Sequence, residues 1–373
     1  MEMIDPLVDY PIVVGMGPAG LFLARQLHKL GCPVGAIARP GDVGVHTNTI
    51  FREALKIAID LDEVCAAIDD IAATIPERRI RLYVASDQYL TLLLQLDDSR
   101  LRSFGLTQGE IDSFRHINDK TAMDDTLFAL SLAPKVYVAG EVPPDAFPCV
   151  IKWNEKRVGL NSCVLPKIGV VHNREDLASL LSKLSCEGFS SNDVIAQRYI
   201  PGNNAFQYSF GGYYNSGNLL AGICVNQVHQ YPQGISSCVV EADGVEAARV
   251  EEAARSVASE LSFSGFLEVE CKMSQENGSL FVLDVNPRPW GWISILGRKF
   301  PGLHYVLLGE RAKPIEKLVL WRTLPRDFLA NANAMNVRLP RQSYVRCLDI
   351  FDQADLRPFL GLGLTAIRKM VPR

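Results

Sequence analysis

The stretch FVLDVNPRPWGW, residues 281–292, carries polar residues at a spacing that suits chemistry. Its opening residues, FVLDV, are rich in β-branched and aromatic types and predict a buried strand. Asp284 and Asn286 stand two apart, so alternation along a strand places both side chains on one face. Arg288 follows between two prolines, which bias the backbone around it towards extended shapes. A carboxylate, an amide and a guanidinium on one rigid edge are typical of a site that binds charged groups.

The preceding strand carries a matching row of charges. In GFLEVECKM, residues 265–273, the side chains of Glu268, Glu270 and Lys272 alternate and therefore share one face. A solvent-facing hairpin edge with scattered charges explains Glu268 and Lys272 well. It does not explain why an asparagine and an arginine are held by flanking prolines, which favours a functional edge.

The turn between the two strands decides which side chains face each other. A two-residue loop of Asn277 and Gly278 sets Glu270 opposite Val285, on the wrong face for Asp284. A three-residue loop, residues 276–278, with Gly278 in the left-handed region sets Glu270 opposite Asp284. We predict the three-residue loop, because it brings the carboxylates together.

The three-residue loop also sets Glu268 opposite Asn286, so three or four oxygen ligands gather on one face. Hard Mg²⁺ requires oxygen ligands of this kind, usually together with substrate phosphates and water. A pre-set arginine beside a metal carboxylate suits phosphoryl transfer, in which charge must be neutralised in place. The pattern therefore predicts a magnesium-assisted phosphoryl-transfer site.

The elements that position this hairpin follow from the rest of the sequence. Residues 11 to about 100 alternate strand and helix, which predicts a parallel, Rossmann-like sheet. One helix, DQYLTLLLQLDDSRL, is expected to begin at Asp87 as its N-cap. From residue 194 onward strands dominate, and the tail after residue 312 is expected to be helical. The fold class is therefore α/β followed by α+β.

Gly15, Gly17 and Gly20 form G-x-G-x-x-G between a strand and a helix, the pattern of a dinucleotide site. That site also requires an acidic residue at the end of the second strand, where this chain has Arg39. A lone glycine pattern is weak. We therefore favour a tight turn that binds nothing or binds the substrate, and keep an NAD- or FAD-dependent oxidoreductase as an alternative.

Composition narrows the partners. The net charge is −4, the pI is about 5.9, and no basic stretch has interleaved aromatics, so nucleic acid is not an expected partner. The start of the chain lacks the basic region of a signal peptide, and the longest apolar runs are too short to span a bilayer. The nine cysteines include no pair at metal-type or redox-type spacing, which predicts reduced thiols and a cytoplasmic location.

Taken in order along the chain, the motifs resemble those of the ATP-grasp carboxylate ligases, over residues from about 80 to about 310. HINDKTAMDDTLFAL is similar to the helix that opens that fold, and FPCVIKW to the strand whose lysine reaches the nucleotide phosphates. DVIAQRYIPG is similar to the hinge strand beside the adenine, while GFLEVECK and FVLDVNPRPWG resemble the two metal strands. LYVASDQYL together with NPRPWG most resembles the amino-acid ligases of the D-aspartate-ligase and carbamoyl-phosphate-synthase-like type.

This resemblance implies a role for each matching residue. The implied ATP-binding residues are Lys120, Lys152, Gln197, Arg198, Tyr199 and Ile200. The implied ligands of Mg²⁺, or alternatively Mn²⁺, are Glu270, Asp284 and Asn286. The implied catalytic residues are Lys152 and Arg288, with Arg288 on the transferred phosphate.

The resemblance also implies the domain organisation. The expected units are a Rossmann-like pre-ATP-grasp domain at 1–117, an ATP-grasp small lobe at 118–200, a large lobe with the metal site at 201–312, and a helical tail at 313–373.

Three features depart from the family pattern. Asp284 stands where glutamate is usual. Asn226, Gln227 and His229 precede the QYP segment, where the family often carries a basic residue that holds the acid substrate. The glycine-rich phosphate loop is only faint in NEKRVGLNS, residues 154–162.

The expected activity is an ATP-dependent ligation. A substrate carboxylate, of an amino acid or a small acid, attacks the γ-phosphorus to give an acyl phosphate and ADP, and an amine then displaces phosphate. Loading of an amino acid on a carrier-protein thiol is the alternative within this class, and a binding protein without catalysis is a third interpretation. The sequence leaves the oligomeric state open, and a dimer is compatible with it.

Overall fold

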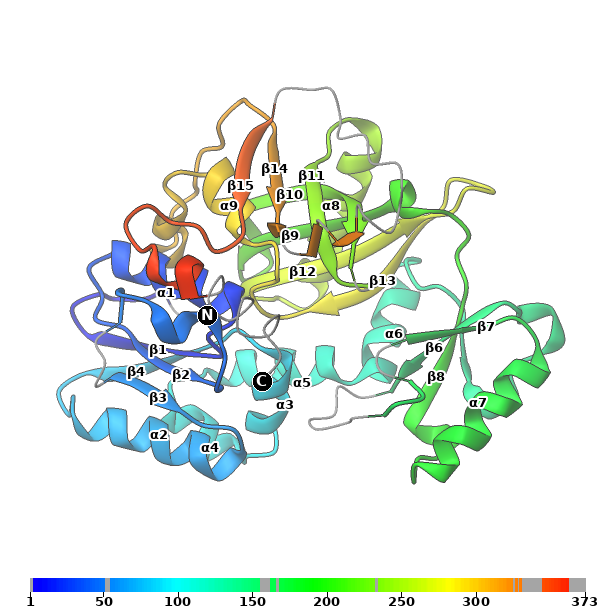
Figure 1. Cartoon of the computed structure of the whole chain (residues 1–373), viewed down its shortest axis with the longest axis horizontal. Helices are drawn as coiled ribbons and strands as arrows, with labels where there is room; N and C mark the ends of the chain where they lie inside the picture. Colours follow the sequence, from blue (N-terminus) through cyan, green and yellow to red (C-terminus); the bar gives the residue numbers. More distant parts are fainter. Residues whose placement is uncertain are drawn as a thin grey trace, which may run out of the picture.

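Three β-sheets organise the chain (Figure 1). The structure is a computed structural model that describes residues 3–50, 54–154, 162–165, 168–231, 234–324, 326–327, 329–330 and 344–361. An α/β unit at the N-terminus is followed by two mostly antiparallel sheets with helices, as predicted.

The N-terminal sheet is parallel throughout, with the strand order β3-β2-β1-β4. Its strands are β1 (Asp9–Val14), β2 (Gly35–Ala38), β3 (Leu55–Ile57) and β4 (Arg79–Val84). Its two flanking helices are α1 (Pro18–Lys29) and α2 (Leu61–Ala73). Val13 packs in the cluster that contains Leu23 of α1, whereas Ile12 packs with Ile68 of α2. The sheet is therefore covered on both faces, as the apolar run of β1 requires.

The helix expected from Asp87 to residue 101 is broken into two. Helix α3 (Asp87–Leu93) is followed by α4 (Asp98–Ser103), because the Asp97 side chain accepts from the Arg100 amide and starts a new helix. Asp87 is also not the N-cap, since Ser86 holds that position. The carboxylate of Asp87 is thereby available to the rest of the molecule.

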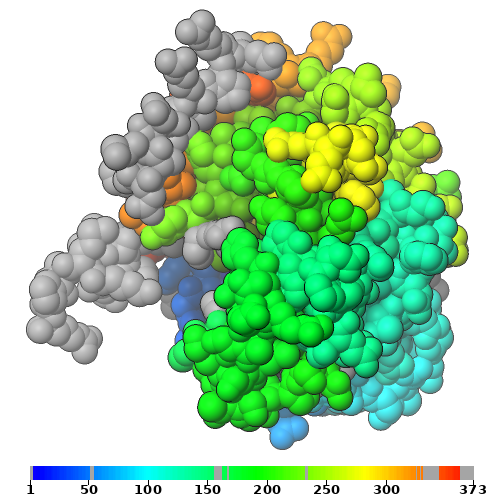
Figure 2. Space-filling view, turned by 90° about the vertical axis from the view of Figure 1, so that its right-hand side faces the viewer, coloured from blue at the N-terminus to red at the C-terminus, as the bar shows by residue number. Residues whose placement is uncertain are grey.

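The second sheet is small and antiparallel, with the order β5-β8-β6-β7. Its strands are β5 (Val136–Val138), β6 (Cys149–Trp153), β7 (Ile168–Val171) and β8 (Val194–Arg198). The helices before and within this region are α5 (Gln108–Asn118), α6 (Lys120–Ala129) and α7 (Arg174–Cys186). Figure 2 shows this lobe (green) below the yellow loop of the β12–β13 hairpin.

The third sheet has seven strands in the order β13-β12-β9-β10-β11-β14-β15. Its first five strands along the chain are β9 (Gln207–Asn215), β10 (Asn218–Gln230), β11 (Ser236–Glu241), β12 (Gly265–Met273) and β13 (Leu280–Asn286). Phe210, Val269 and Val285 share a cluster with α8 (Gly244–Glu260) on one face. On the other face Trp290 packs against Phe266 and over Gly211, where a Cβ would lie 2.1 Å from the indole.

The prediction of a helical tail is wrong for much of the described C-terminal region. β14 (Val319–Arg322) pairs antiparallel with β11, and β15 (Val345–Leu348) pairs parallel with β14. Both segments are short apolar runs that complete the edge of a sheet, and such runs are ambiguous between strand and helix when only local pattern is used.

Short helices connect these elements. They are α9 (Ser294–Lys299) and the 3-10 turns η1 (Val43–His46), η3 (Ala139–Glu141), η4 (Pro144–Ala146), η5 (Ser191–Asp193), η6 (Asn204–Phe206) and η7 (Leu303–Leu308). Within the described part of the chain, no helix has both the length and the apolar character needed to cross a membrane.

Candidate active site

The β12–β13 hairpin brings the predicted metal ligands together. Glu270 faces Asp284 and Glu268 faces Asn286, as predicted. The Asn286 amide nitrogen lies 3.3 Å from the Glu268 carboxylate and 3.4 Å from that of Glu270. The hairpin therefore gathers three carboxylates and one amide on a single face.

The predicted three-residue loop is wrong. The Ser274 amide donates to the Ser279 carbonyl at 2.8 Å, so the loop consists of the four residues 275–278. Gly278 has the predicted positive φ, 68°. A four-residue loop without further change would set Glu270 opposite Leu283, on the wrong face.

A bulge in β13 restores the pairing. Cys271 faces Val282 and Glu270 faces Asp284, so Leu283 is an extra residue on β13. The carbonyl of Leu283 accepts a hydrogen bond from Lys152 Nζ at 3.0 Å. The bulge therefore corrects the register and also creates a contact to the small sheet.

Lys152 joins the small sheet to β13. Its Nζ also donates to Gln197 Oε1 at 2.6 Å, from the neighbouring strand β8. Burial lowers the pKa of the Lys152 ammonium. A buried ammonium at a junction between sheets is placed to bind an anion, and the structure thus brings Lys152 and Gln197 together as the nucleotide interpretation requires.

The remaining hinge residues carry the chain from β8 towards β9. The Arg198 amide donates to the Lys135 carbonyl at 2.8 Å, and the Tyr199 amide donates to that of Pro148 at 3.1 Å. Ile200 is buried. The backbone here is ordered by the small sheet, and the contact of these residues with adenine stays a prediction.

Lys120 lies at the start of α6 and reaches the same group of carboxylates. Its Nζ is 2.5 Å from Asp284 Oδ1. Burial disfavours the ammonium charge, but the carboxylates of Asp284, Asp87 and Asp124 together outweigh this effect and raise the pKa of Lys120. Asp124 follows one helical turn later, and burial raises its pKa to about 6 against the influence of Lys152 and Lys120.

Glu268 is not a solvent-facing edge residue. Only 6% of it is exposed, and its carboxylate accepts from the indole Nε1 of Trp292 at 2.9 Å. Burial, followed by the charge of Glu270, raises the pKa of Glu268 to about 8. Carboxylates crowded to this degree repel one another, and a cation among them would relieve that repulsion.

Arg288 contacts a residue of the N-terminal unit. Its Nε donates to Asp87 Oδ1 at 2.7 Å, its Nη2 contacts the second oxygen of the same carboxylate, and its Nη1 donates to the Pro289 carbonyl at 3.0 Å. Burial disfavours the guanidinium charge, yet Asp87 outweighs it and raises the pKa of Arg288 above its ordinary value. The fork of Arg288 is therefore held in place by α3.

A cavity of about 440 Å³ opens beside this ion pair. Its charged lining residues are Arg39, Asp42, Asp87 and Arg288, and the glycine turn contributes Gly15 and Gly17. Gly20 does not line the cavity, because it packs on the turn, where a Cβ would lie 1.9 Å from the Gly15 carbonyl oxygen. The glycine turn and the segment that bears Arg288 thus line one shared cavity.

Solved structures resemble this arrangement. N5-carboxyaminoimidazole synthetase from Staphylococcus aureus superposes with a TM-score of 0.63 at 15% identity, covering 90% of this chain and 88% of that one. An L-amino acid ligase from Bacillus licheniformis gives 0.59 at 14% identity over 83% and 75% of the chains. The biotin carboxylase domain of the Hydrogenobacter thermophilus 2-oxoglutarate carboxylase, in complex with MgADP, gives 0.60 at 13% over 83% and 73%.

All three are ATP-grasp ligases, and each aligns over most of both chains. The chain has the ATP-grasp fold. No protein-family model and no curated protein matches the sequence. The fold was therefore expected from motifs and is established by three-dimensional similarity.

The residues assigned from the sequence leave out three residues of the candidate site. Glu268 alternates with Glu270 and could have been included on that ground alone. Asp124 stands four positions after Lys120 on one helix, a spacing that shares a face. Asp87 follows β4 directly, beside the glycine turn, and only the pairing of β1 with β4 brings it there.

The departures from the ATP-grasp family pattern are explained in part. The Asn226 side chain donates to the carbonyls of Ala205 and Gln207 at 3.0 and 3.1 Å, and Gln227 bonds Ser209. These two side chains thus stabilise the backbone at residues 205–207 and the contact between β10 and β9. Residues 155–161, which include the faint glycine-rich loop, lie outside the described residues.

The Glu268 carboxyl predicts a pH-dependent stability. Its pKa is raised from 4.5 to about 8, so the folded chain holds this proton more tightly than the unfolded chain. The free energy of unfolding should therefore fall as the pH rises from about 5 to about 8. Thermal unfolding in the presence of a chelator should show the melting temperature falling by several degrees across this range.

The matched variants are Glu268→Gln and Glu276→Gln. Glu268→Gln should reduce the fall of the melting temperature with pH. Glu276→Gln, at an exposed position of the hairpin loop, should leave that fall unchanged. Identical pH profiles for the wild type and Glu268→Gln would contradict the burial of this carboxyl as the cause.

Proposed function

We propose that the chain is an ATP-dependent ligase that activates a carboxylate as an acyl phosphate and joins it to an amine, releasing ADP and phosphate. The carrying observation is the junction at β13. Lys152 from the small sheet and Lys120 from α6 converge on the Leu283–Asp284 segment that also bears the carboxylate face. The lysines of the smaller lobe face the carboxylates of the larger lobe. A nucleoside triphosphate and its metal ion could bind between these two sets of charges.

A divalent cation fits this face by its donors. Glu268, Glu270 and Asp284 supply carboxylate oxygens and Asn286 supplies an amide oxygen. Burial, followed by the charge of Glu270, raises the pKa of Glu268 well above its ordinary value. Oxygen ligands of this kind suit Mg²⁺. We propose Glu270, Asp284 and Asn286 as ligands, with Glu268 beside them. Bound there, the cation would neutralise phosphate charge during transfer.

The chain's own residues would act mainly by position and charge. Lys120 and Lys152 would bind phosphate oxygens. Their present contacts with Asp284 and Leu283 would be exchanged for contacts with the nucleotide. Gln197 to Ile200 would border the adenine. Arg288, held by Asp87 as a planar fork, would stabilise the charge that develops on the transferred phosphate. The substrate carboxylate would attack the γ-phosphorus and break its bond to the bridging oxygen, so that ADP leaves and an acyl phosphate forms. The amine would then attack the acyl carbon, lose a proton and expel phosphate.

The shared cavity is our proposed site for the acid or amine substrate. Side chains of both charges line it, Arg39 and Arg288 with positive charge and Asp42 and Asp87 with negative charge. Its volume of about 440 Å³ is in the range of sites that bind small molecules. A dinucleotide is the weaker occupant, since Arg39 stands where the ribose would need an acid and stacks on Tyr89 at 5.2 Å.

ATP with Mg²⁺ should raise the melting temperature by several degrees through ligand linkage, and NADH or FAD should not. A screen of amino acids and small acids, each with and without an amine, should then identify pairs that trigger ADP release. A thiol acceptor in place of the amine tests the carrier-protein alternative. Stabilisation by NADH with ATP inert would overturn the ligase, and ATP binding without ADP release from any pair would favour a binding protein.

A further inference from the structure

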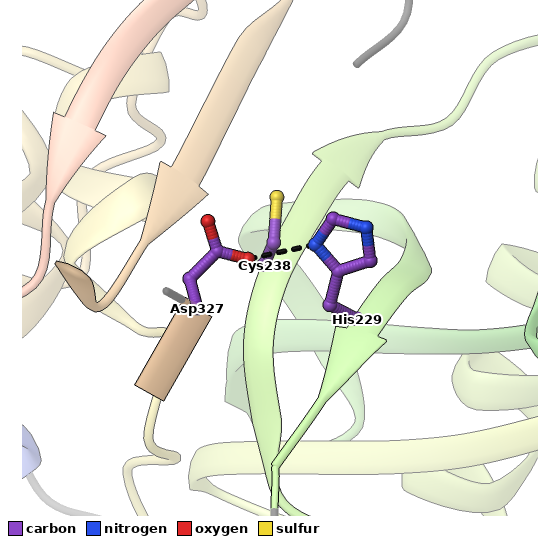
Figure 3. Close-up of side chains that lie close together, drawn as sticks. All are labelled: His229, Cys238 and Asp327. Atoms are coloured by element: carbon purple, nitrogen blue, oxygen red, sulfur yellow. Dashed lines mark hydrogen bonds and ion pairs between the residues drawn. The ribbon is translucent and has the colours of Figure 1, made fainter. Parts of the chain in front are cut away.

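Three potential metal ligands, His229, Cys238 and Asp327, lie close together on β10, β11 and the segment after β14 (Figure 3). His229 of β10 pairs with Cys238 of β11, which in turn pairs with Arg322 of β14. Asp327 follows β14 by one helical turn, since its amide donates to the Thr323 carbonyl at 2.9 Å. The imidazole nitrogen, thiol sulfur and carboxylate oxygen all lie within 4.8 Å of one another.

The register explains why these side chains meet. The β10–β11 pairing shifts between Gln227 and His229, which marks a bulge there. The shift turns His229 towards the face of Cys238, whereas Gln227 bonds Ser209 on the other face. Strands rarely bulge without a positional reason.

This group is separate from the candidate active site. Cys238 belongs to a small cluster with Val240 and Leu320, while the intervening Val239 belongs to the cluster that contains Trp290. Alternation therefore places Cys238 on the face opposite to Trp290. Cys238 lies on β11, whose neighbours in the sheet are β10 and β14, and the three strands β12, β9 and β10 separate β11 from β13.

Each carboxylate oxygen of Asp327 has a hydrogen-bond partner. Asp327 is fully buried; its Oδ1 lies 2.7 Å from His229 Nδ1, and its Oδ2 accepts from Arg322 Nε at 2.6 Å. A hydrogen-bond donor behind a ligating carboxylate is the usual support in metal sites. The His229 side chain is 12% exposed, so one edge of the group reaches solvent while the thiol does not.

We propose that His229, Cys238 and Asp327 form a binding site for a borderline divalent cation of the Zn²⁺ class. Nitrogen, sulfur and oxygen donors together are the set that Zn²⁺ takes, with a fourth tetrahedral position left for water at the exposed edge. Zn–N and Zn–O bonds of about 2 Å separate two donors by about 3.3 Å. His229 and Asp327 would thus move apart by about 0.6 Å to admit the ion, a small rotation of a partly exposed ring.

Two simpler roles account for less of the arrangement. An ion-pair network explains Arg322, Asp327 and His229, but it assigns nothing to the thiol beside them. A Cys–His–Asp hydrolase requires a thiol that a substrate can reach, whereas Cys238 is fully buried. Bound at this place, the ion would cross-link β10, β11 and the turn after β14, which is a structural role.

Cobalt(II) is the probe, because a thiolate ligand produces a near-ultraviolet charge-transfer band that oxygen ligands do not. The full-length, chelator-treated protein is titrated with Co²⁺ in a buffer containing Mg²⁺, which occupies oxygen sites such as the one at β13. We expect the thiolate band to rise to an equimolar end point and Zn²⁺ to displace it. The melting temperature should rise with Zn²⁺.

The variants decide the assignment. Cys238→Ser should abolish the band, and His229→Gln should weaken Co²⁺ binding at least about tenfold. Cys163→Ser, at an exposed cysteine, is the matched control and should behave as the wild type. Circular dichroism checks folding, and His229→Gln is decisive should Cys238→Ser not fold. Absence of a thiolate band, or an undiminished band in Cys238→Ser or His229→Gln, would overturn the proposal.

Discussion

Replacing Glu270 with glutamine should abolish ligase turnover while leaving the chain as stable as the wild type in the absence of metal. Glu270 faces Asp284 and lies beside Glu268, so its negative charge is crowded. Removing that charge relieves repulsion in the folded state, and removing a proposed metal ligand should cost transition-state stabilisation. We expect a loss of at least about 100-fold in ADP release, equivalent to about 2.7 kcal/mol.

The measurement pairs thermal unfolding with turnover. Without Mg²⁺ the melting temperature of Glu270→Gln should equal or exceed that of the wild type, and the gain on adding ATP with Mg²⁺ should largely vanish. Glu276→Gln, on the exposed loop of the same hairpin, should retain both activity and the ATP-dependent gain. A fully active Glu270→Gln enzyme would remove this residue from the metal site and leave the carboxylate face without its proposed purpose.

Arg288→Lys is expected to lower turnover by at least about tenfold, or roughly 1.4 kcal/mol, with a smaller effect on ATP binding. Lysine keeps the positive charge but loses the planar fork, which here grips both oxygens of Asp87. A single ammonium can satisfy Asp87 or a phosphate oxygen but cannot hold the fixed geometry. Because developing phosphate charge appears only during transfer, the cost should appear in kcat rather than in the ATP affinity.

Two further variants separate positioning from contact. Asp87→Asn leaves the arginine in place but loosens its fork, so turnover should fall less than in Arg288→Lys. Arg255→Lys, on the exposed face of α8, is the matched control and should be silent. Asn286→Ala removes a proposed oxygen ligand without changing the charge and should also lower turnover at least about tenfold. Normal turnover in both Arg288→Lys and Asn286→Ala would show that the edge is structural.

Much of the hairpin could be predicted because strand chemistry is local. Alternation has a period of two, so the spacing of Glu268 with Glu270 and of Asp284 with Asn286 already determines which side chains share a face. The prolines around Arg288 likewise restrict the backbone whatever surrounds them. The parallel N-terminal sheet and the lysine of β6 follow from equally local patterns of apolar run, glycine turn and helix.

The route to the correct register could not be predicted. A loop one residue longer than expected moves every side chain of β13 to the opposite face. The bulge at Leu283 returns residues 284–286 to the expected face. The two local deviations cancel, so the expected Glu270–Asp284 pairing is correct although the loop behind it is not. The bulge is stabilised by Lys152, more than a hundred positions away, which no local pattern contains.

The sequence by itself therefore determined the kind of site: the oxygen donors, the rigid arginine and the strands that bear them. Only the tertiary structure decided the partners. Arg288 meets Asp87 across 201 positions, Lys120 meets Asp284 across 164, and His229 meets Asp327 across 98. Such pairs form because sheets and helices from distant segments bury charge together, and burial makes an unpaired charge costly. Local periodicity predicts which face of a strand or helix a side chain takes. Which charged residue packs against that face is decided by the tertiary structure.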